Sequence, residues 1–554
     1  MQSPSRVRYQ VVVVATLMSF VLYLHRFFLS FIERFIKLDM GLSDTQIGWL
    51  FSVFFIAYGI GQVPGGWLSD RFGVRRMLTI YILLWSICTG LFGLAASFLL
   101  IVLLRVGTGL SQAGAYPTSA TMISKWSPFQ VRGIVSSIVA MGGRIGGAAA
   151  PMLTAYLLIA FVPVSMPSLL QEGEIVNVRG LVDATVTEKA TPEQEALGRL
   201  LLKNATKVQM NTIYPPPSDL PASEWRKIIN PVLQEPDLYE RFGEGKVQLA
   251  REAKQIAKIP AADRTQQQVE RLNRLLLEAV YPKQIKQIYG SGWRPVIFLY
   301  CAVGLAIALL FFVVVRDRPH IHPWVNESET QLIDESRPKG TPDPNAEVGA
   351  LPIHLFLINK SLWYSSISQF ATVFGHIFVL TWFPRYLAEV HNVPVLERAF
   401  MTMLPMVAGM LGMMAGGVWT DAFVKQLGLR RGRSWPLAIA RLVGTIAFAA
   451  CLYFDSRWGA TIALTIMAFA TDLGVPAVWA YNQDVGGKLA GSVLGWGNMF
   501  GCIGAAASPV VLNMVIESGG WSAMFLVCSA SLGIATITAL GMNAESAVAA
   551  LEDS

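Results

Sequence analysis

Long apolar runs dominate this chain, and short polar stretches separate them. A helix needs about 20 predominantly apolar residues to cross a bilayer. In the first half, such runs lie near 10–32, 46–68, 77–96, 98–123, 133–161 and 292–315. In the second half, they lie near 362–384, 397–421, 435–454, 459–481, 487–515 and 521–542. The pattern predicts an all-α membrane protein with twelve transmembrane helices in two bundles of six.

The composition agrees with this prediction and excludes other classes of protein. Of the 554 residues, 53% are hydrophobic and 15% are charged, and the mean hydropathy is +0.47. Soluble proteins carry about 25% charged residues, so both a soluble enzyme and a disordered chain are excluded. The five cysteines lie inside apolar runs without metal-ligand spacing. We therefore expect no disulfide, no metal and no cofactor.

The distribution of lysine and arginine predicts the orientation in the membrane. With the N-terminus inside, seventeen of these residues fall in inner loops and five in the short outer loops. Basic loops stay on the cytoplasmic side. The first run is too long for the hydrophobic region of a signal peptide, so we expect a retained span. We expect both termini in the cytoplasm and the protein in the cytoplasmic (inner) membrane of a bacterium.

Two polar stretches divide the chain. Residues 317–360 connect the halves, and 337–346 have the composition of a flexible, Pro-rich linker. Residues 162–291 fall outside and carry apolar residues at helical spacing in 198–207, 246–259 and 266–280, which predicts a small, mostly helical domain. A partly disordered insertion is the alternative. The predicted domains are the N-terminal bundle with helices 1–5 (1–161), the extracytoplasmic insertion (162–291), helix 6 (292–316), the cytoplasmic linker (317–360), the C-terminal bundle with helices 7–12 (361–543) and a cytoplasmic tail (544–554).

A motif rich in Gly, Asp and Arg follows the second span, where residues 65–76 are GGWLSDRFGVRR. Small residues let helices approach closely, a carboxylate can pair with a helix N-terminus, and arginines stay inside. The motif resembles the inner-loop signature of the major facilitator superfamily, and residues 416–421 (GGVWTD) form a weaker echo in the second half. The resemblance implies that the gating residues are Gly66, Asp70, Arg71, Arg75 and Arg76.

Further motifs resemble the anion:cation symporter branch of that superfamily. They include residues 104–117 (LRVGTGLSQAGAYP), 381–387 (TWFPRYL) and 497–499 (GNM). The branch includes transporters of hexuronates, aldonates and aldarates. The resemblance covers nearly all of the chain except residues 162–291, and it implies the major facilitator fold.

Three arginines lie within predicted spans, namely Arg26, Arg105 and Arg144. An arginine at the centre of a bilayer costs about 2.5–3.5 kcal/mol on the insertion scale, so it usually faces a cavity. Arg26 could instead reach the outer surface, and Arg105 could simply join two helices. Cations on the interior faces of several helices favour a site for an anion.

The resemblance also assigns ligands around these arginines. In the family, a Tyr-x-x-Arg pair in span one binds the carboxylate and hydroxyl groups of the substrate, and Tyr23 and Arg26 match this pair. Family positions in spans two, seven and eleven match Tyr58, Gln369 and Asn498. Arg144 matches no family ligand, but we include it among the substrate-binding residues because its glycine-rich surroundings leave room for a long side chain only in a cavity.

Two neutral residues stand where proton-coupled members of the branch carry carboxylates. Those relatives have an aspartate before the span-one arginine and a glutamate in span four, whereas this chain has His25 and Gln112. Glutamine cannot titrate, and histidine can, although a histidine in a span is more often structural. The candidate coupling residues are His25, Arg105, Gln112 and Asp472, with His376 as a weaker one. A proton and a sodium ion are both candidates for the coupling ion.

These observations favour a secondary active transporter that moves a small organic anion, a sugar acid above all, by alternating access. The alternatives are an organic phosphate or other carboxylate as substrate, and a transporter-derived receptor that binds the anion without net flux. A membrane enzyme is disfavoured, because residues 162–291 contain no His or Cys. We expect a monomer in the lipid bilayer that binds no nucleic acid.

Overall fold

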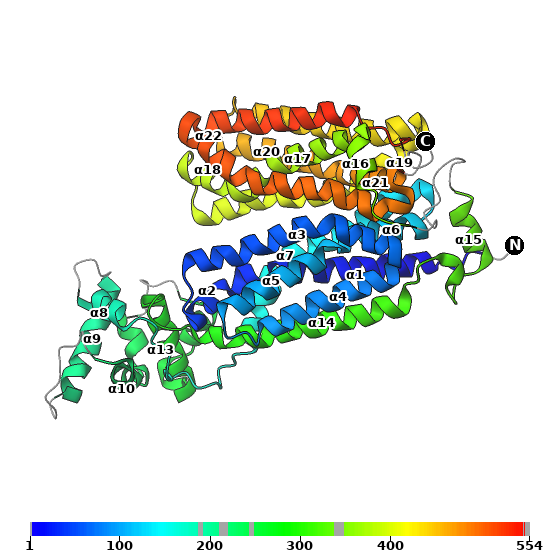
Figure 1. Cartoon of the computed structure of the whole chain (residues 1–554). Helices are drawn as coiled ribbons and strands as arrows, with labels where there is room; N and C mark the ends of the chain where they lie inside the picture. Colours follow the sequence, from blue (N-terminus) through cyan, green and yellow to red (C-terminus); the bar gives the residue numbers. More distant parts are fainter. Residues whose placement is uncertain are drawn as a thin grey trace.

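The computed structural model describes residues 3–186, 192–209, 220–242, 249–336, 348–546 and 548. They form two helical halves side by side, with a small helical domain attached to the first (Figure 1). Both termini lie at one end of the molecule, here called the terminal end, and the attached domain lies at the other, the insertion end. The predicted linker at 337–346 and the last six residues of the predicted tail lie outside the described residues.

The first half contains α1 (Val7–Phe27), α2 (Leu29–Met40), α3 (Asp44–Phe72), α4 (Val74–Phe92), α5 (Phe98–Ala113), α6 (Ala115–Trp126), α7 (Arg132–Ala160) and α14 (Trp293–Val314). The second half contains α17 (Lys360–Thr381), α18 (Phe383–Glu389), α19 (Val395–Ala450), α20 (Arg457–Leu473), α21 (Val475–Gly486) and α22 (Ala490–Leu540). Along the chain, the two halves are connected by a segment that contains α15 (Glu327–Asp334) and α16 (Ile353–Ile358).

The described helices account for twelve spans. Nine stretches are long and apolar enough to cross a membrane, if the bent pair α17–α18 counts as one. Left-handed backbone at Gly428 (φ 78°) divides one stretch into two. Gly487 (φ 52°) and Gly520 (φ 70°) divide another into three. Glycine takes these angles without steric cost, so each break turns the chain back into the membrane. The predicted all-α fold with twelve spans is confirmed.

Four spans are themselves interrupted near their middle or outer part. The breaks separate α1 from α2 at Phe28, α5 from α6 at Gly114, α17 from α18 at Trp382, and α20 from α21 at Gly474. They fall at matching places in the two halves, in spans one, four, seven and ten. The backbone at all four residues stays in the right-handed helical region, so these are local irregularities and not unwound segments.

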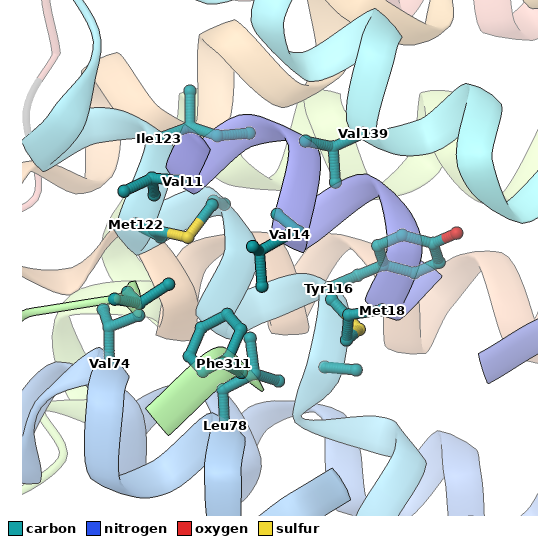
Figure 2. Packing of buried hydrophobic residues seen from close by; sticks show 14 of the residues in the cluster. Val11, Val14, Met18, Val74, Leu78, Tyr116, Met122, Ile123, Val139 and Phe311 are labelled. Carbon is teal, nitrogen blue, oxygen red and sulfur yellow. The ribbon is translucent and has the colours of Figure 1, made fainter. Parts of the chain in front are cut away.

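The core of the first half joins five helices. Figure 2 shows Val11, Val14 and Met18 of α1 packed against side chains of α4, α6, α7 and α14. Two glycines bring α7 unusually close to α1: a Cβ at Gly142 or at Gly146 would lie 2.3 Å from a backbone oxygen of α1. Close approach through small residues is the main way in which helices associate within a membrane.

The domain at 162–291 has a hydrophobic core of its own. Its helices are α8 (Val178–Val186), α9 (Pro192–Gln209), α10 (Ala222–Leu233), α11 (Leu238–Phe242), α12 (Arg251–Ala257) and α13 (Gln266–Val280). Trp225, Leu276 and Tyr281 are fully buried among them. The helix expected at 266–280 has the predicted bounds, whereas residues 246–248 of another expected helix lie outside the described part of the chain. The helical character of this segment is therefore observed where it is described.

Charged contacts fasten this domain to the first half. Asp39 at the end of α2 accepts hydrogen bonds from Lys286 and from Arg294, the latter at 3.0 Å. Burial raises the pKa of the Asp39 carboxyl, but the two cations outweigh burial and hold its pKa below the usual value. The domain is thus anchored to the body that contains α2 and α14.

The two ends of the inserted segment meet. A Cβ at Gly292 would lie 2.7 Å from the Leu158 oxygen and 3.1 Å from the Val162 side chain. We therefore expect that replacing residues 163–291 with a short Gly/Ser linker leaves the twelve-span body folded. Size-exclusion chromatography and thermal unfolding in detergent measure this: a monodisperse peak and a cooperative transition are expected, and aggregation would contradict the expectation.

Candidate functional site

Arg26 of α1 lies in a box of aromatic and amide groups between helices of the first half. Its guanidinium carbon lies 4.9 Å from the centre of the Tyr23 ring and 4.3 Å from that of Tyr58 on α3. Its Nε donates to Oε1 of Gln112 on α5 at 3.2 Å. Its Nη2 is buried without a hydrogen-bond partner among the described residues. A buried donor left unpaired is costly, so the box is suited to an anionic acceptor.

Arg105 lies behind this box and shares an aromatic ring with Arg26. Phe54 of α3 has the Arg105 guanidinium 4.4 Å from its centre and that of Arg26 at 5.8 Å. Arg105 donates through Nε to the Leu50 oxygen at 3.1 Å. Within the described chain, neither arginine forms an ion pair with a carboxylate. Two of the three arginines that stand out in the sequence therefore lie close together, without a carboxylate partner among the described residues.

Glycines of α7 place Tyr23 against Tyr116. A Cβ at Gly143 would lie 2.3 Å from the Tyr116 hydroxyl and 2.7 Å from the Tyr23 ring, so only glycine fits there. The Tyr116 hydroxyl hydrogen-bonds with the Ser19 hydroxyl at 2.8 Å, and its ring packs edge-on against Trp479 of the second half. Figure 2 shows this hydroxyl pointing away from the apolar cluster. Tyr116 thus connects the core to the space between the halves.

Arg144 on α7 forms an ion pair with Asp472 on α20. Arg144 Nη2 donates to Asp472 Oδ1 at 2.8 Å. This ion pair joins the two halves. The sequence predicted Arg144 as a substrate ligand and Asp472 as a coupling residue, without pairing them. The Arg144 side chain is 33% exposed and the Asp472 side chain 6%.

The second half contributes neutral groups. Asn498 of α22 lies across from Gln62 of α3, with Nδ2 3.5 Å from the Gln62 Oε1. Gln369 of α17 is buried against Gly497, where a Cβ would lie 2.0 Å from the Gln369 Nε2. Of the two predicted amide ligands, Asn498 therefore faces α3 of the first half, whereas Gln369 packs against the neighbouring residue Gly497.

The structure does not bring His25 to this site. His25 is fully buried, its Nε2 hydrogen-bonds with the Tyr300 backbone oxygen at 2.9 Å, and its ring stacks on the Tyr300 ring. It therefore faces α14 and α4, whereas Arg26 faces α3 and α5. His376, the weaker candidate, has its Nδ1 3.3 Å from the Thr471 hydroxyl, next to Asp472 in sequence.

Asp70 of the predicted gating motif connects the two halves at the terminal end. Its carboxylate accepts hydrogen bonds from the backbone nitrogens of Gly491 (3.0 Å) and Ser492 (2.7 Å), at the start of α22. The hydroxyls of Ser492 and Thr121 donate to it at 2.7 and 2.6 Å. A carboxylate at a helix N-terminus satisfies free backbone donors and is favoured by the helix dipole. A Cβ at Gly66 would lie 2.3 Å from the Gly491 oxygen, so glycine permits the contact.

The echo of the motif makes the reciprocal contact. Asp421 on α19 accepts from the backbone nitrogens of Gly133 (3.1 Å) and Ile134 (3.0 Å), at the start of α7. A Cβ at Gly417 would lie 3.0 Å from the Gly133 oxygen. Each half thus supplies one aspartate to a helix N-terminus of the other half, and both contacts lie at the terminal end.

The three arginines of the motif have other partners. Arg71 lies over the Trp67 and Phe72 rings. Arg75 lies over the Phe312 ring, and its backbone nitrogen donates to Asp317 at 2.9 Å. Arg76 is exposed. These arginines lie around the terminal ends of α3, α4 and α14, and none of these contacts crosses to the second half.

A buried charge network near the two aspartates was missed by sequence reasoning. Asp484 of α21 accepts from Arg132 Nη1 at 2.9 Å and from Arg433 Nε at 2.8 Å, and Arg433 also contacts Asp421 at 3.3 Å. Asp484 follows Asn482 and Gln483 just beyond the predicted span 459–481, so no signal in the sequence marks it. Arg441 was missed too, although it lies inside an apolar run; it is buried and donates to the Ser368 hydroxyl.

The chain is similar to proteins of a known family. The sequence model of the Major Facilitator Superfamily matches residues 15–167 and 287–509, on both sides of the inserted domain. The chain belongs to the Major Facilitator Superfamily. It is therefore a multi-pass membrane transporter and not an enzyme.

Curated relatives in the superfamily carry specific names. The chain is 23% identical over 545 residues to a probable sulfoacetate transporter of Cupriavidus necator, covering 98% of this chain and 95% of the relative. It is 23% identical over 531 residues to a probable galactarate/D-glucarate transporter of Bacillus subtilis, covering 93% and 87%. A hexuronate transporter of Bacillus subtilis is 20% identical over 94% of this chain and 90% of its own.

Solved structures of the superfamily share the fold. The transporter FucP in the outward conformation has a TM-score of 0.59 at 14% identity, covering 96% of this chain and 99% of its own. A human organic anion transporter has a TM-score of 0.53 at 13% identity, covering 97% and 100%. These likenesses support the arrangement of two helical halves.

Proposed function

We propose that this protein is a secondary active transporter of a small organic anion, of the sugar-acid kind, that works by alternating access between its two halves. The observation that carries the proposal is Arg26, a half-buried cation between helices of the first half, whose Nη2 is buried without a hydrogen-bond partner and which has no carboxylate partner among the described residues. Such a charge is costly in a membrane unless an anion neutralises it. The names of the sulfoacetate, galactarate/D-glucarate and hexuronate relatives agree with an acidic substrate.

The groups around Arg26 suit a polyhydroxylated acid. Tyr23, Tyr58 and Gln112 offer hydroxyl and amide groups in the first half, and Asn498, which lies across from Gln62, offers an amide in the second. The guanidinium can hold a carboxylate through two parallel hydrogen bonds, while neutral donors and acceptors hold hydroxyls. An organic phosphate is the main rival, because the same fork also fits a phosphate group.

Alternating access would proceed by breaking the contacts at the terminal end. In the orientation that the basic loops favour, this end faces the cytoplasm, with both termini, and the inserted domain lies outside. Asp70, Asp421 and the Arg132–Asp484 pair then hold the cytoplasmic side closed around an outward-facing site. The transporter would lie in the cytoplasmic membrane of a bacterium.

For coupling, the contacts favour Asp472 over His25. Asp472 lies at the interface in contact with Arg144, whereas His25 is enclosed by α4 and α14. A proton or sodium ion would act there by changing the charge opposite Arg144. A receptor without flux is the alternative of a different class, and the closely packed gate at Gly66 favours a working transporter over it.

Uptake into cells or vesicles tests the proposal. We expect one or a few members of a panel to enter well above background, the panel being galactarate, glucuronate, gluconate, sulfoacetate, a hexose phosphate and glutamate. The sugar-acid assignment would be overturned if the protein is expressed, takes up the sugar phosphate, and takes up every organic acid no faster than cells with the empty vector. The Gly/Ser-linker variant should show measurable uptake of the same compound.

A further inference from the structure

The central space contains more positive than negative charge. Arg26, Arg105 and Arg144 lie on three helices of the first half, and among the described residues only Asp472 contacts any of them as a carboxylate. Gln112 occupies the position next to Arg26 as a neutral amide, so it contributes no charge. The described cluster thus carries two positive charges in excess. Electroneutrality in a medium of low dielectric constant favours a ligand that brings two negative charges.

Arg26 and Arg144 have two tyrosine neighbours in common. Tyr23 and Tyr116 lie within electrostatic range of both arginines. A Cβ at Gly143, the neighbour of Arg144 in sequence, would lie 2.7 Å from the Tyr23 ring and 2.3 Å from the Tyr116 hydroxyl. The two tyrosines therefore lie close to both cations, and Tyr116 also contacts Trp479 of the second half.

The geometry of the Arg144–Asp472 ion pair allows a ligand to replace Asp472 as the partner of Arg144. Asp472 is held through a single nitrogen, Nη2, at 2.8 Å, which leaves the second side of the guanidinium fork outside the pair. The Arg144 side chain is 33% exposed, so a ligand in the space between the halves can reach it. By contrast, Arg132 and Arg433 at the terminal end are buried in their pairs with Asp484, with exposed fractions of 6% and 1%.

We propose that Arg144 is the second anion-binding residue of the site, and that the substrate is a dianion whose far acidic group displaces Asp472 from Arg144 while Arg26 holds the near one. The proposal rests on the proposed transport function and names the substrate class within it. Displacement would also break the Arg144–Asp472 contact between the halves, so binding would itself loosen the interface at its centre. A monoanion reaches Arg26 only and leaves the ion pair in place.

The test compares two acids that share a carbon chain and differ in one terminal group, galactarate with two carboxylates and galactonate with one. Equilibrium binding to the purified full-length protein gives the ratio of their affinities. In the wild type we expect galactarate to bind at least about tenfold more tightly, the value of one charge-assisted hydrogen bond. In Arg144→Gln the ratio should fall to about one. In Asp472→Asn, where nothing competes for Arg144, galactarate should bind about tenfold more tightly than to the wild type.

Controls separate this inference from misfolding and from failure of the proposed function. The double variant Arg144→Gln with Asp472→Asn removes both charges together, so it should fold, and its ratio should also be about one. Arg385→Gln, in an exposed pair with Glu389, should keep the wild-type ratio. A wild-type ratio near one, or an unchanged ratio in Arg144→Gln, would overturn the inference while leaving organic-anion transport intact. If neither acid binds and no organic acid of the panel enters vesicles, the proposed function itself fails.

Discussion

Replacing Arg26 with alanine should abolish uptake while the protein still reaches the membrane. Arg26 is the cation in the aromatic box, and its Nη2 has no partner among the described side chains, so its loss leaves the near acidic group of the substrate without a counter-charge. Truncating one partner of a buried, hydrogen-bonded charge pair costs about 2–5 kcal/mol. Affinity should therefore fall by at least about 30-fold. Lysine at this position should rescue poorly, because it keeps the charge but lacks the planar fork.

The measurement is uptake of the labelled substrate at matched surface levels, with Arg385→Ala as the control. Arg385 lies in an exposed pair with Glu389 and touches none of the box residues, so its replacement should leave uptake near the wild-type level. Near-normal uptake by Arg26→Ala would contradict the site. Loss of uptake in both variants would indicate a general defect in assembly and would equally contradict the assignment of a specific role to Arg26.

Replacing Asp70 with asparagine should slow the transport cycle more than it weakens substrate binding. The Asp70 carboxylate accepts four hydrogen bonds, two of them from backbone nitrogens at the start of α22. Asparagine offers one acceptor oxygen and turns an NH₂ group towards donors, so part of this set is lost. We expect the uptake rate to fall more than about tenfold, the loss expected for one charge-assisted hydrogen bond, with the substrate Kd changed less than about threefold.

Asp421→Asn provides the matched variant from the other half, because Asp421 makes the same kind of contact with the start of α7. It should slow the cycle in the same sense. Rates and Kd values are measured on the same purified preparations, by uptake into liposomes and by equilibrium binding. A Kd that rises in step with the loss of rate would place Asp70 in binding or folding, and would contradict a gating role.

Apolar periodicity was enough to predict the twelve spans, since each run is long enough to cross the bilayer and loop residues separate them. It did not predict the irregularities at Phe28, Gly114, Trp382 and Gly474, because the length of an apolar run does not report local helix geometry. The prolines at 117, 384 and 476, two or three residues after three of these positions, were the available signal. The helix at 266–280 was predictable to the residue, since Thr265 and Gln268 form a capping box at its start.

The candidate site was only partly predictable. A charge inside an apolar run costs free energy, so Arg26, Arg105 and Arg144 stand out in the sequence, and Arg441 should have stood out by the same reasoning. The partner of each charge depends on helix packing and is not visible in the sequence. Arg144 pairs with Asp472, which lies 328 positions away, and His25 faces Tyr300 rather than Arg26. Consecutive residues of a helix point in different directions. His25 therefore lies outside the site, although it precedes Arg26 in the sequence.

Counterflow in liposomes tests the central claim most directly. Vesicles that contain the purified protein are loaded with unlabelled substrate, and the entry of the labelled compound is followed without any ion gradient. A transporter that alternates around one site must exchange, so we predict entry many times faster than into empty vesicles, and loss of this acceleration in Arg26→Ala. Tight binding of the acid by the wild type without accelerated entry would contradict the account, because the protein would then be a receptor that does not carry its ligand across the membrane.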